Sequence, residues 1–566
     1  MTRSIFYLFT LIILLVSCSG SRSVNINPFQ YAIQKKGTGT NGAVVSAHPL
    51  ASQTGLAMLK QGGNAVDAAI ATQLALAVVY PAAGNIGGGG FTVIRLANGQ
   101  TVTIDYREKA PGKAHRDMYL DEQGNAQTNL SQNGHLAAGV PGAVAGIFKS
   151  LPYAKLPFKK LIQPAIELAE KGYVITAAEA RSLNHSQNDF IKYNTVTPVF
   201  VKPGGWKEGD TLVQKDLANT LKRIRDNGQK GFYEGETARL IVEEMKRAHG
   251  IISYEDLKQY EARERTPVIF DYKGYKIITM PLPSSGGVLL PQMMHMIEDQ
   301  PVKQYGFQTA ESVQLITEIE RRAYADRAKF LGDVDFYNVP VEQLTSKAYA
   351  KERMKDYQPK TAGTSTAIGA GIIPESEETT HFSVCDKEGN AVSVTTTLNG
   401  GYGCNTVVGG AGFLLNNEMD DFSIKPGVPN MYGAVGADAN AIAPGKRMLS
   451  SMTPTIVLKN EKPYLVLGTP GGTTITTSVF QTLINILEFN MSVDDAVNKP
   501  KFHHQWLPDQ IFVEPSFPQA VRDQLQQMGY TIKQRGSIGR TEVIRIDGGT
   551  IEAVADHRGD DAAAVY

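Results

Sequence analysis

The hydrophobic pattern of this chain predicts one long buried helix near its start. Residues 65–81 (AVDAAIATQLALAVVYP) are almost entirely apolar, and Gly62-Gly63-Asn64 before them ends in a residue that caps helix N-termini. Asp67, Thr72 and Gln73 interrupt the apolar surface, and a proline ends the run. The segment is therefore predicted to be a core helix rather than a membrane span.

Strand and helix patterns follow in blocks along the rest of the chain. Hairpins are indicated where two alternating stretches flank a short turn, and helices where apolar residues recur with a helical period. Because both patterns occur in both halves, we expect an α+β fold in which helices cover sheets. The strand patterns lie at 91–108, 266–280, 381–398 and 453–467 and in a last hairpin, and the helix patterns lie within 161–356 and at 473–489 and 518–528.

Two short motifs suggest chemistry that their context does not support. Residues 84–90 (GNIGGGG) resemble a phosphate-binding loop, but such a loop follows a strand and opens a helix, and this one does the reverse. We interpret its glycines as sites of close backbone packing. Ser284 and Ser285 invite a hydrolase interpretation, but Pro283 stands where a nucleophile elbow needs its first glycine. Residues 283–287 are therefore predicted to be a loop.

The overall charge gives no support to nucleic-acid binding. Lysine plus arginine equals aspartate plus glutamate, at 56 each. We expect no nucleic-acid partner, and we interpret basic pairs such as Lys159-Lys160 and Arg321-Arg322 as solvated helix faces.

The cysteines and histidines predict neither a disulfide nor a metal site. Cys385 lies within a strand pattern and Cys404 within a glycine-rich turn, so two buried free thiols are expected rather than a bridge. His503 and His504 are adjacent, and adjacent side chains on a strand point to opposite faces, which makes them a poor chelate. We predict that the protein binds no metal.

The first residues resemble an export signal. A positive charge at Arg3 precedes a short apolar stretch at 5–16, and Leu15-Val16-Ser17-Cys18 resembles the bacterial lipobox, in which the cysteine is acylated. We expect residues 1–17 to be a lipoprotein signal peptide and residues 18–40 to be a tether. The protein would then be exported to the periplasmic side and anchored by lipid, in the outer membrane if the cell has one. The alternative is an ordinary cleaved signal that happens to end near a cysteine.

The junction between Glu378 and Thr379 is a candidate site for cleavage that would create a catalytic residue. A segment rich in small residues (361–378) ends there, and a strand pattern begins without turn residues. If the peptide bond before Thr379 were broken, that residue would carry both a hydroxyl nucleophile and a free α-amine. The amine titrates near pH 7.7–8.0, so it can accept the hydroxyl proton without help from a histidine.

Several sequence blocks in a fixed order carry a resemblance to a known family. The chain resembles the γ-glutamyltransferase (γ-glutamyltranspeptidase) family of N-terminal nucleophile hydrolases across residues 42–566, essentially the whole exported chain. The resemblance implies a four-layer αββα fold and self-cleavage into a large subunit, residues 41–378, and a small subunit, residues 379–566. The two subunits would form one interleaved body. The blocks are TTHFSV at 379–384, TTTLN at 395–399, LLNNEMDDF at 414–422, KPGVPNMYG at 425–433, LSSMTPT at 449–455, GTPGG at 468–472 and FHHQWLPD at 502–509.

The same resemblance implies a role for particular residues in catalysis. Thr379 matches the nucleophile, and Thr397 matches the threonine that orients it. Gly471 and Gly472 match the glycines whose backbone N–H groups form the oxyanion hole. Tyr432 lies in a segment that resembles a lid loop over the substrate, although a static surface loop would have the same composition.

Other matching residues would hold an α-amino acid head group. Arg107 matches the arginine that binds the α-carboxylate, where a planar fork suits the ligand better than lysine. Ser450 and Ser451 match serines that bind the same carboxylate. Asp421 matches the residue that binds the α-ammonium group, with Asn399 and Glu418 beside it in the same role.

The resemblance implies γ-glutamyl transfer or hydrolysis with glutathione as the typical donor. The acceptor would be an amino acid, a dipeptide or water, and no cofactor would be needed. One alternative is a cephalosporin or glutaryl acylase of the same family, against which Arg107 and Asp421 argue. Another is an inactive, uncleaved surface lipoprotein.

Overall fold

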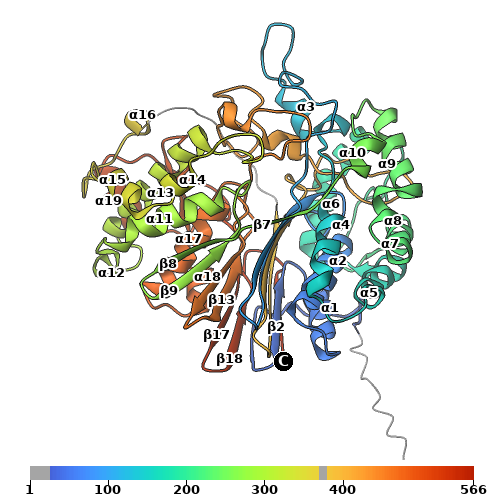
Figure 1. Ribbon diagram of the computed structural model, residues 1–566, viewed down its shortest axis with the longest axis horizontal. Helices are drawn as coiled ribbons and strands as arrows, with labels where there is room; N and C mark the ends of the chain where they lie inside the picture. The colour runs from blue at the N-terminus through green and yellow to red at the C-terminus, as the bar shows by residue number, and fades with distance from the viewer. Residues whose placement is uncertain (1–25, 369–378) are drawn as a thin grey trace, which may run out of the picture.

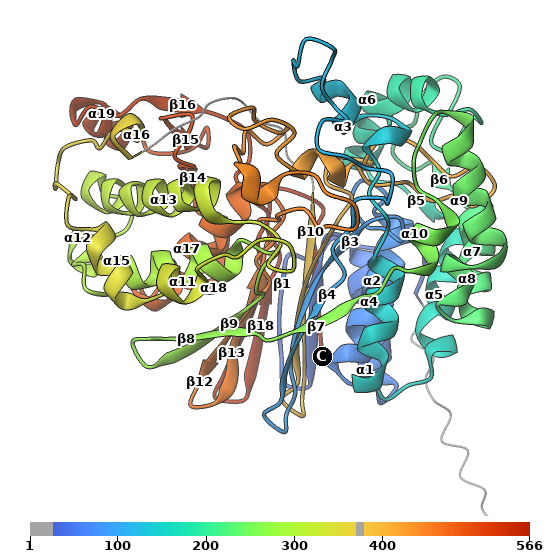
Figure 2. The same ribbon diagram turned by 45° about the horizontal axis from the view of Figure 1, so that its top comes forward.

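Two seven-stranded antiparallel sheets lie face to face, with helices on both outer faces (Figures 1 and 2). The computed structural model describes residues 26–368 and 379–566. The four-layer αββα arrangement expected from the family resemblance is confirmed. The signal peptide, Cys18, the first part of the tether and Glu378 lie outside the described residues.

The strands of each sheet come from distant parts of the sequence. The first sheet runs in the order β1 (Lys36–Gly39), β18 (Thr550–Val554), β17 (Glu542–Asp547), β13 (Lys462–Gly468), β12 (Thr455–Lys459), β9 (Tyr275–Thr279) and β8 (Val268–Tyr272). The second runs in the order β19 (Ala562–Val565), β2 (Gly42–Ser46), β10 (Thr380–Asp386), β11 (Ala391–Thr397), β3 (Gly89–Arg95), β4 (Thr101–Asp105) and β7 (Arg263–Arg265). Two small sheets consist of β14 (Phe502–His503), β15 (Ile511–Val513) and β16 (Ile532–Gln534), and of β5 (Tyr173–Val174) and β6 (Thr211–Leu212).

Helices bury the outer face of each sheet. The all-apolar segment forms α2, which is buried along its whole length, and Asn64 caps it as expected. Beside the second sheet lie α1 (Pro49–Lys60), α2 (Ala65–Val79), α3 (Thr128–Gln132), α4 (Ala143–Ser150), α5 (Phe158–Lys171), α6 (Ala177–Tyr193), α7 (Lys215–Asn227), α8 (Lys230–Tyr233), α9 (Gly235–Arg247) and α10 (Tyr254–Lys258). Beside the first lie α11 (Gly286–Glu298), α12 (Val302–Tyr305), α13 (Ala310–Phe330), α14 (Val341–Leu344), α15 (Lys347–Arg353), α16 (Ser365–Ile368), α17 (Thr474–Leu487), α18 (Val493–Asn498) and α19 (Gln519–Gln527).

The strand after Thr379 is central and fully enclosed. β10 pairs with β11 on one side and β2 on the other, and every residue of β10 and β11 is buried. Apolar and polar residues alternate along both strands, but both faces of this part of the second sheet are covered. The first sheet covers one face, and helices such as α2 cover the other. A core of residues such as Phe91, Ile456 and Ile544 fills the space between the sheets.

Strands from before and after residue 378 are interleaved in both sheets. In the second sheet, β10 and β11 lie between β2 and β3, and β19 closes the edge beside β2. A break before Thr379 would therefore leave two chains joined by whole ladders of hydrogen bonds and by one shared core.

The prediction for Arg321-Arg322 was wrong. Both side chains are buried, because α13 runs through the helical layer rather than over its surface. Arg321 Nε lies 3.3 Å from Glu318 Oε1, and Arg322 Nη1 lies 2.6 Å from Glu318 Oε2. Glu318, three or four residues earlier on the same helix, thus takes the place of water as the partner of both guanidinium groups.

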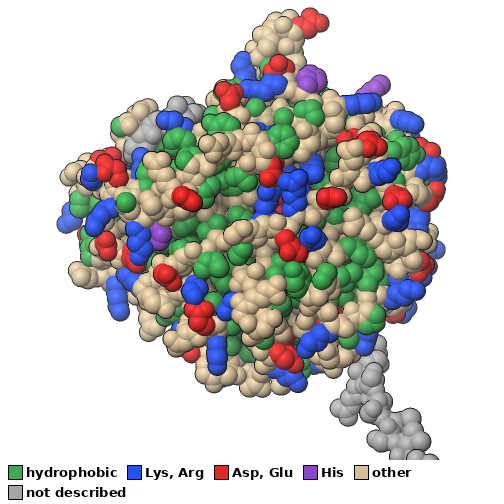
Figure 3. Space-filling model, viewed as in Figure 1, with side chains coloured by type: hydrophobic (Ala, Val, Ile, Leu, Met, Phe, Trp, Pro, Cys, Tyr) green, Lys and Arg blue, Asp and Glu red, His purple; other side chains and the backbone are tan. Residues whose placement is uncertain are grey.

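Other expectations are confirmed in the described part of the chain. Cys385 and Cys404 are buried free thiols. The hairpin and helix patterns at 266–280, 453–467, 473–489 and 518–528 all form the expected element type. None of the helices described in residues 26–368 and 379–566 is long and apolar enough to cross a membrane. Acidic and basic side chains are intermixed over the face shown in Figure 3.

Candidate active site

A cavity of about 310 Å³ collects the site residues expected from the sequence. We call it the head-group cavity. Gly471 is the exception, since it lines a neighbouring cavity that also reaches Thr379. The expected residues that line the head-group cavity are Arg107, Thr379, Thr397, Asn399, Glu418, Asp421, Tyr432, Ser450, Ser451 and Gly472.

The two threonines meet because of strand register. Thr380 pairs with Thr396, so Thr379 and Thr397 stand opposite each other where the β10–β11 ladder ends. Their hydroxyl oxygens are 3.4 Å apart, and both residues are nearly fully buried. The hydroxyl of Thr397 also accepts a 2.7 Å hydrogen bond from the backbone N–H of Asn399. That bond fixes the Thr397 side chain, and because the hydroxyl acts as acceptor in it, the hydroxyl proton can still point toward Thr379.

The histidine that follows the nucleophile candidate cannot serve as its base. His381 Nδ1 lies 2.9 Å from Thr395 Oγ1 and its Nε2 lies 3.1 Å from Ser383 Oγ, so both ring nitrogens are engaged in the core. Burial lowers the pKa of His381 to about 3. Among the described residues that line the head-group cavity there is no histidine. A base for Thr379 must therefore be sought in another group.

Gly471 and Gly472 connect β13 to α17 through a turn that requires glycine. Gly471 has φ 135° and Gly472 has φ 52°, in the region that side chains rarely adopt. A Cβ on Gly472 would lie 2.5 Å from Cδ1 of Tyr432. A Cβ on Gly471 would lie 2.4 Å from Oγ1 of Thr474, so the backbone can pack against Thr474 and Tyr432 only because these side chains are absent.

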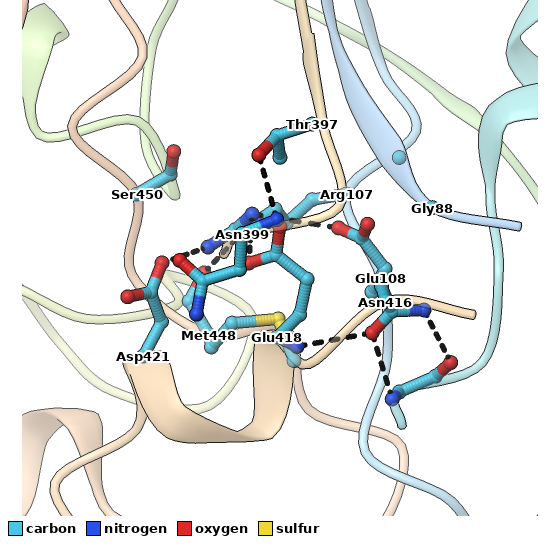
Figure 4. Close-up of polar contacts among 12 residues, drawn as sticks. Gly88, Arg107, Glu108, Thr397, Asn399, Asn416, Glu418, Asp421, Met448 and Ser450 are labelled. Atoms are coloured by element: carbon cyan, nitrogen blue, oxygen red, sulfur yellow. Dashed lines mark hydrogen bonds and ion pairs between the residues drawn. The ribbon is translucent and has the colours of Figure 1, made fainter. Parts of the chain in front are cut away.

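Arg107 lies at the centre of an acidic cluster (Figure 4). Its Nη1 is 2.5 Å from Glu418 Oε2 and 3.4 Å from Glu108 Oε2, and its Nη2 forms an ion pair with Asp421. Its Nε also donates to the carbonyl of Met448 at 3.3 Å. Arg107 follows β4, and Glu418 and Asp421 lie on the 3-10 helix η3 (Glu418–Asp421). A short helix that follows β11 in the chain thus presents both acids to one guanidinium.

The charges in this cluster are unbalanced. Burial raises the pKa of Glu108 to about 8, that of Glu418 well above its ordinary value, and that of Asp421 as well, although Arg107 opposes all three shifts. Burial alone would lower the pKa of Arg107, but the nearby carboxylates raise it. Arg107, together with Arg327, which acts on Asp421 from α13, faces three acids, so the cluster has room for a further positive charge, such as an α-ammonium group.

Ser451 and Ser285 accept hydrogen bonds from a second buried arginine, which the sequence interpretation missed. Arg327, on α13, lines the cavity, and its Nη2 donates to Ser451 Oγ at 3.1 Å. Its Nε donates to Ser285 Oγ at 3.3 Å. The loop predicted at 283–287 is confirmed for residues 283–285, whereas Gly286 and Gly287 open α11. Ser284 lies beside Ser450, so this turn supports the site. The signal for Arg327 was present in the run of charges on α13, which we interpreted as solvated.

Tyr432 and Asn430 close the cavity from the segment expected to act as a lid. Tyr432 is buried, and its hydroxyl donates to the carbonyl of Asn399. Asn430, which sequence analysis did not single out, donates to Asp421 Oδ1 at 2.8 Å. The segment therefore lies over the cavity and holds one of its acids; whether it opens stays a prediction.

Comparison with known proteins matches this geometry to one family. The family model described as Gamma-glutamyltranspeptidase matches residues 51–566. A glutathione hydrolase proenzyme of Escherichia coli K12 is 47% identical over 532 residues, which cover 93% of this chain and 92% of the relative. An acylase ACY 1 proenzyme of Pseudomonas sp. SE83 is 36% identical, over 93% of this chain and 94% of the relative.

Solved structures give the same picture. A cephalosporin acylase from Bacillus halodurans superposes with a TM-score of 0.82 at 26% identity, over 96% of this chain and 99% of that one. A γ-glutamyltranspeptidase from Helicobacter pylori is 48% identical with a TM-score of 0.57, over 59% of this chain and 95% of that one. The fold is thus shared by proteins named for two different acyl groups.

Proposed function

Since this chain belongs to the γ-glutamyltranspeptidase family, we propose that it transfers or hydrolyses γ-glutamyl groups through an ester on Thr379. Glutathione or another γ-glutamyl compound would be the donor. The observation that carries the proposal is the head-group cavity, in which a buried arginine and two acids lie in the same cavity as the paired hydroxyls of Thr379 and Thr397. No cofactor is needed for this chemistry.

Maturation would use the same hydroxyl as catalysis. In the precursor, Thr379 Oγ attacks the carbonyl carbon of Glu378, the C–N bond breaks, and the hydroxyl proton passes to the nitrogen, which becomes the free α-amine of Thr379. Water then hydrolyses the ester to release the Glu378 carboxylate. The products are a large subunit ending at Glu378 and a small subunit, residues 379–566. Interleaved strands in both sheets support a stable heterodimer of the two.

In the mature enzyme the α-amine of Thr379 acts as general base and then general acid. The hydroxyl attacks the γ-carbonyl carbon of the donor, and its proton passes to the α-amine and on to the leaving amine. The acyl-enzyme ester is then attacked by water or by an acceptor amine, and the proton released returns to Thr379 Oγ. The backbone N–H groups of Gly471 and Gly472 would stabilise the oxyanion, and Thr397 would orient the nucleophile.

The donor head group would be held by charge and by shape. Its α-carboxylate would bind Arg107, Ser450 and Ser451, and its α-ammonium group would bind Asp421, Glu418 and Asn399. The ammonium group would supply the further positive charge that the acidic cluster can accommodate. Tyr432 would cover the bound group and reduce access of water.

The acylase alternative predicts a different preference for the head group. The alternative is worth testing because the chain is similar to proteins named as acylases. A glutaryl or similar acyl group, however, has no α-ammonium group to pair with Asp421. We expect a γ-glutamyl anilide to be cleaved much faster than a glutaryl anilide. Asp421→Asn should reduce turnover of the γ-glutamyl compound about 10–100-fold and leave slow glutaryl cleavage unchanged, because a charge-assisted hydrogen bond is lost for one substrate only.

N-terminal sequencing of the purified protein tests both maturation and catalysis. We expect two fragments, the smaller beginning at Thr379, and release of aniline from the γ-glutamyl anilide. Thr379→Ala should give one uncut, inactive chain, whereas Thr379→Ser keeps a hydroxyl and should still be cut. Active protein in which the bond before Thr379 is intact would overturn the mechanism. A wild-type chain that is both uncut and inactive would instead favour the inactive surface lipoprotein.

The site of action would be outside the cytoplasm. Export is proposed from the signal pattern at 1–17, and lipid anchoring from the lipobox cysteine, Cys18. Expression in a bacterium fed a labelled fatty acid tests the anchor. Label should enter the large subunit and be absent from Cys18→Ser; an unlabelled wild-type protein would favour an ordinary cleaved signal.

A further inference from the structure

The block at 502–509 has no part in the chemistry proposed above, yet one of its side chains reaches the walls of the head-group cavity. Gln505 lies two residues after β14 and is 4% exposed. Its amide contacts Thr473 and Tyr432, which both line the cavity. Thr473 follows Gly472 in the turn before α17, whereas Tyr432 lies in the segment expected to act as a lid. Two separate walls of the cavity thus meet at one glutamine.

The direction of each hydrogen bond of Gln505 follows from its partners. The carbonyl of Tyr432 can only accept, so the amide nitrogen of Gln505 must face it, at 3.4 Å. The amide oxygen then accepts from Thr473 Oγ1 at 2.5 Å and from His503 Nε2 at 2.9 Å. With its proton on Nε2, His503 accepts at Nδ1 from the hydroxyl of Thr477 at 2.8 Å. Every donor in this chain of bonds therefore has an acceptor.

The surroundings hold this network in place. Burial lowers the pKa of His503 to about 3, so the ring stays neutral at physiological pH. The ring centre of His503 lies 5.8 Å from that of Tyr324 and 6.3 Å from that of Phe512. Tyr324 also donates from its hydroxyl to the carbonyl of Thr473. Thr473 is thus held at its side chain by Gln505 and at its carbonyl by Tyr324.

The position of Thr473 matters because Gly472 precedes it directly. A donor in an oxyanion hole is effective only when it is already aimed at the place where negative charge develops. The turn and the segment above it are also in close contact, since a Cβ on Gly472 would lie 2.5 Å from a ring carbon of Tyr432. A bridge between the turn and that segment therefore controls both walls together.

We propose that Gln505 is a positioning residue that holds the glycine turn and the segment around Tyr432 at a fixed separation around the bound donor. The inference rests on the proposed function. Gln505 is not among the described residues that line the head-group cavity, so it would act through its two partners and not on the donor. Its bond to Thr473 would aim the backbone N–H of Gly472, and its bond to Tyr432 would keep the head group covered.

Two variants separate the two bonds. Thr473→Val removes the hydroxyl that bonds to Gln505 and leaves the bond to Tyr432, whereas Gln505→Met keeps the length of the side chain and removes both bonds. The mature enzymes are compared by steady-state kinetics with a γ-glutamyl anilide, with activity expressed per cleaved protein.

The two variants should differ in KM. Thr473→Val should lower kcat about 10-fold with little change in KM, because a group that acts on the transition state is less well aimed. Gln505→Met should show the same loss of kcat and a rise of about 10-fold in KM, because the cover over the head group is also released. The inhibition constant of free glutamate, which has the same head group, should rise with KM in Gln505→Met alone.

Gln214 is a matched control for a merely structural role. It is also a buried glutamine, 2% exposed, and its amide nitrogen donates to the backbone carbonyl of Val78 at 2.7 Å. It is not among the described residues that line the head-group cavity. Gln214→Met should lower the melting temperature about as much as Gln505→Met does, but its kcat and KM should keep their wild-type values.

A further variant covers the case in which Gln505→Met does not mature. Gln505→Asn keeps the amide but is one carbon shorter, so it cannot reach Thr473 and Tyr432 together. It should show a smaller loss of kcat and a smaller rise in KM, and it then decides by the same two constants.

The outcomes separate this inference from the proposed function. A wild-type protein that releases no aniline from the γ-glutamyl anilide refutes the function itself. Normal release by wild type, together with wild-type kcat and KM in the Gln505 variants, overturns only the role of Gln505. A wild-type KM in Gln505→Met with a lower kcat would also overturn it, because the bond to Tyr432 would then have no effect on donor binding.

Discussion

Replacing Gly472 by alanine tests whether close approach of the backbone is needed for catalysis. Gly472 has φ 52°, and a Cβ there would lie 2.5 Å from a ring carbon of Tyr432. Gly548→Ala is the matched control. Gly548 has φ 57°, lies in the turn between β17 and β18, and has no atom within 4 Å of its built Cβ.

The two variants share one energetic cost and differ in the other. Alanine in the left-handed region costs about 1–2 kcal/mol at either position. At Gly472 the ring of Tyr432 must also move by about an ångström to restore ordinary contact, which weakens its hydrogen bond to the carbonyl of Asn399. The shift also moves the N–H group that we propose for the oxyanion hole, and loss of such a donor costs about 10²–10³-fold in rate.

We expect Gly548→Ala to melt a few degrees below wild type with unchanged kcat/KM. Gly472→Ala should melt at least as low and lose about 10²–10³-fold in kcat/KM for a γ-glutamyl anilide. Activity is expressed per cleaved protein on a gel, so that impaired maturation is not mistaken for impaired turnover. If both variants keep wild-type kcat/KM, the proposed oxyanion hole and the packing of Tyr432 on it are both wrong.

Three other predictions concern side chains around the nucleophile. Thr397→Val removes the hydroxyl that faces Thr379 and should lower kcat about 10–100-fold, whereas Thr397→Ser should keep most of the activity; steady-state kinetics compare the two. Arg327→Lys cannot keep both of its serine contacts, so we expect KM for the donor to rise about 10-fold with little change in kcat. Glu108 has a pKa raised to about 8 by burial, so its protonated form is favoured by folding; the stability it contributes is full below about pH 4 and is lost as the pH rises through 8. Glu108→Gln should therefore reduce the fall in melting temperature between pH 5 and pH 8, while Glu122→Gln, at an exposed position, should follow wild type.

The fold could be predicted from the sequence wherever local pattern and burial agree. The capped apolar run became α2, and the hairpins at β8–β9 and β12–β13 formed where turn residues separate two strand patterns. The pairing of β10 with β2 and of β11 with β3 could not be derived from pattern alone. Nothing local to Thr379 specifies that a strand more than 300 residues earlier will lie beside it.

The candidate site residues were expected from the family resemblance, and for some of them the structure adds a reason in the backbone. Thr379 and Thr397 face each other because hairpin register puts them there, and Gly472 has a φ that favours glycine. Arg327 was missed because its role depends on α13 being buried, and a helix rich in arginine and glutamate has the composition of an exposed one.

Buried charge on α13 and around Arg107 follows one physical rule. A charged side chain can be buried when its partners are buried with it, and α13 supplies Glu318 for Arg321 just as η3 supplies Asp421 for Arg107. Around Arg107 the acids outnumber the cations, Arg107 and Arg327, and burial raises the pKa values of those acids. Burial also raises the pKa of Glu542, beside Asp561 and Arg540, well above its ordinary value, so an excess of acid does not by itself mark a substrate site. What favours a substrate site around Arg107 is that the unbalanced cluster lines a cavity together with Thr379, on segments that only the folded chain brings together.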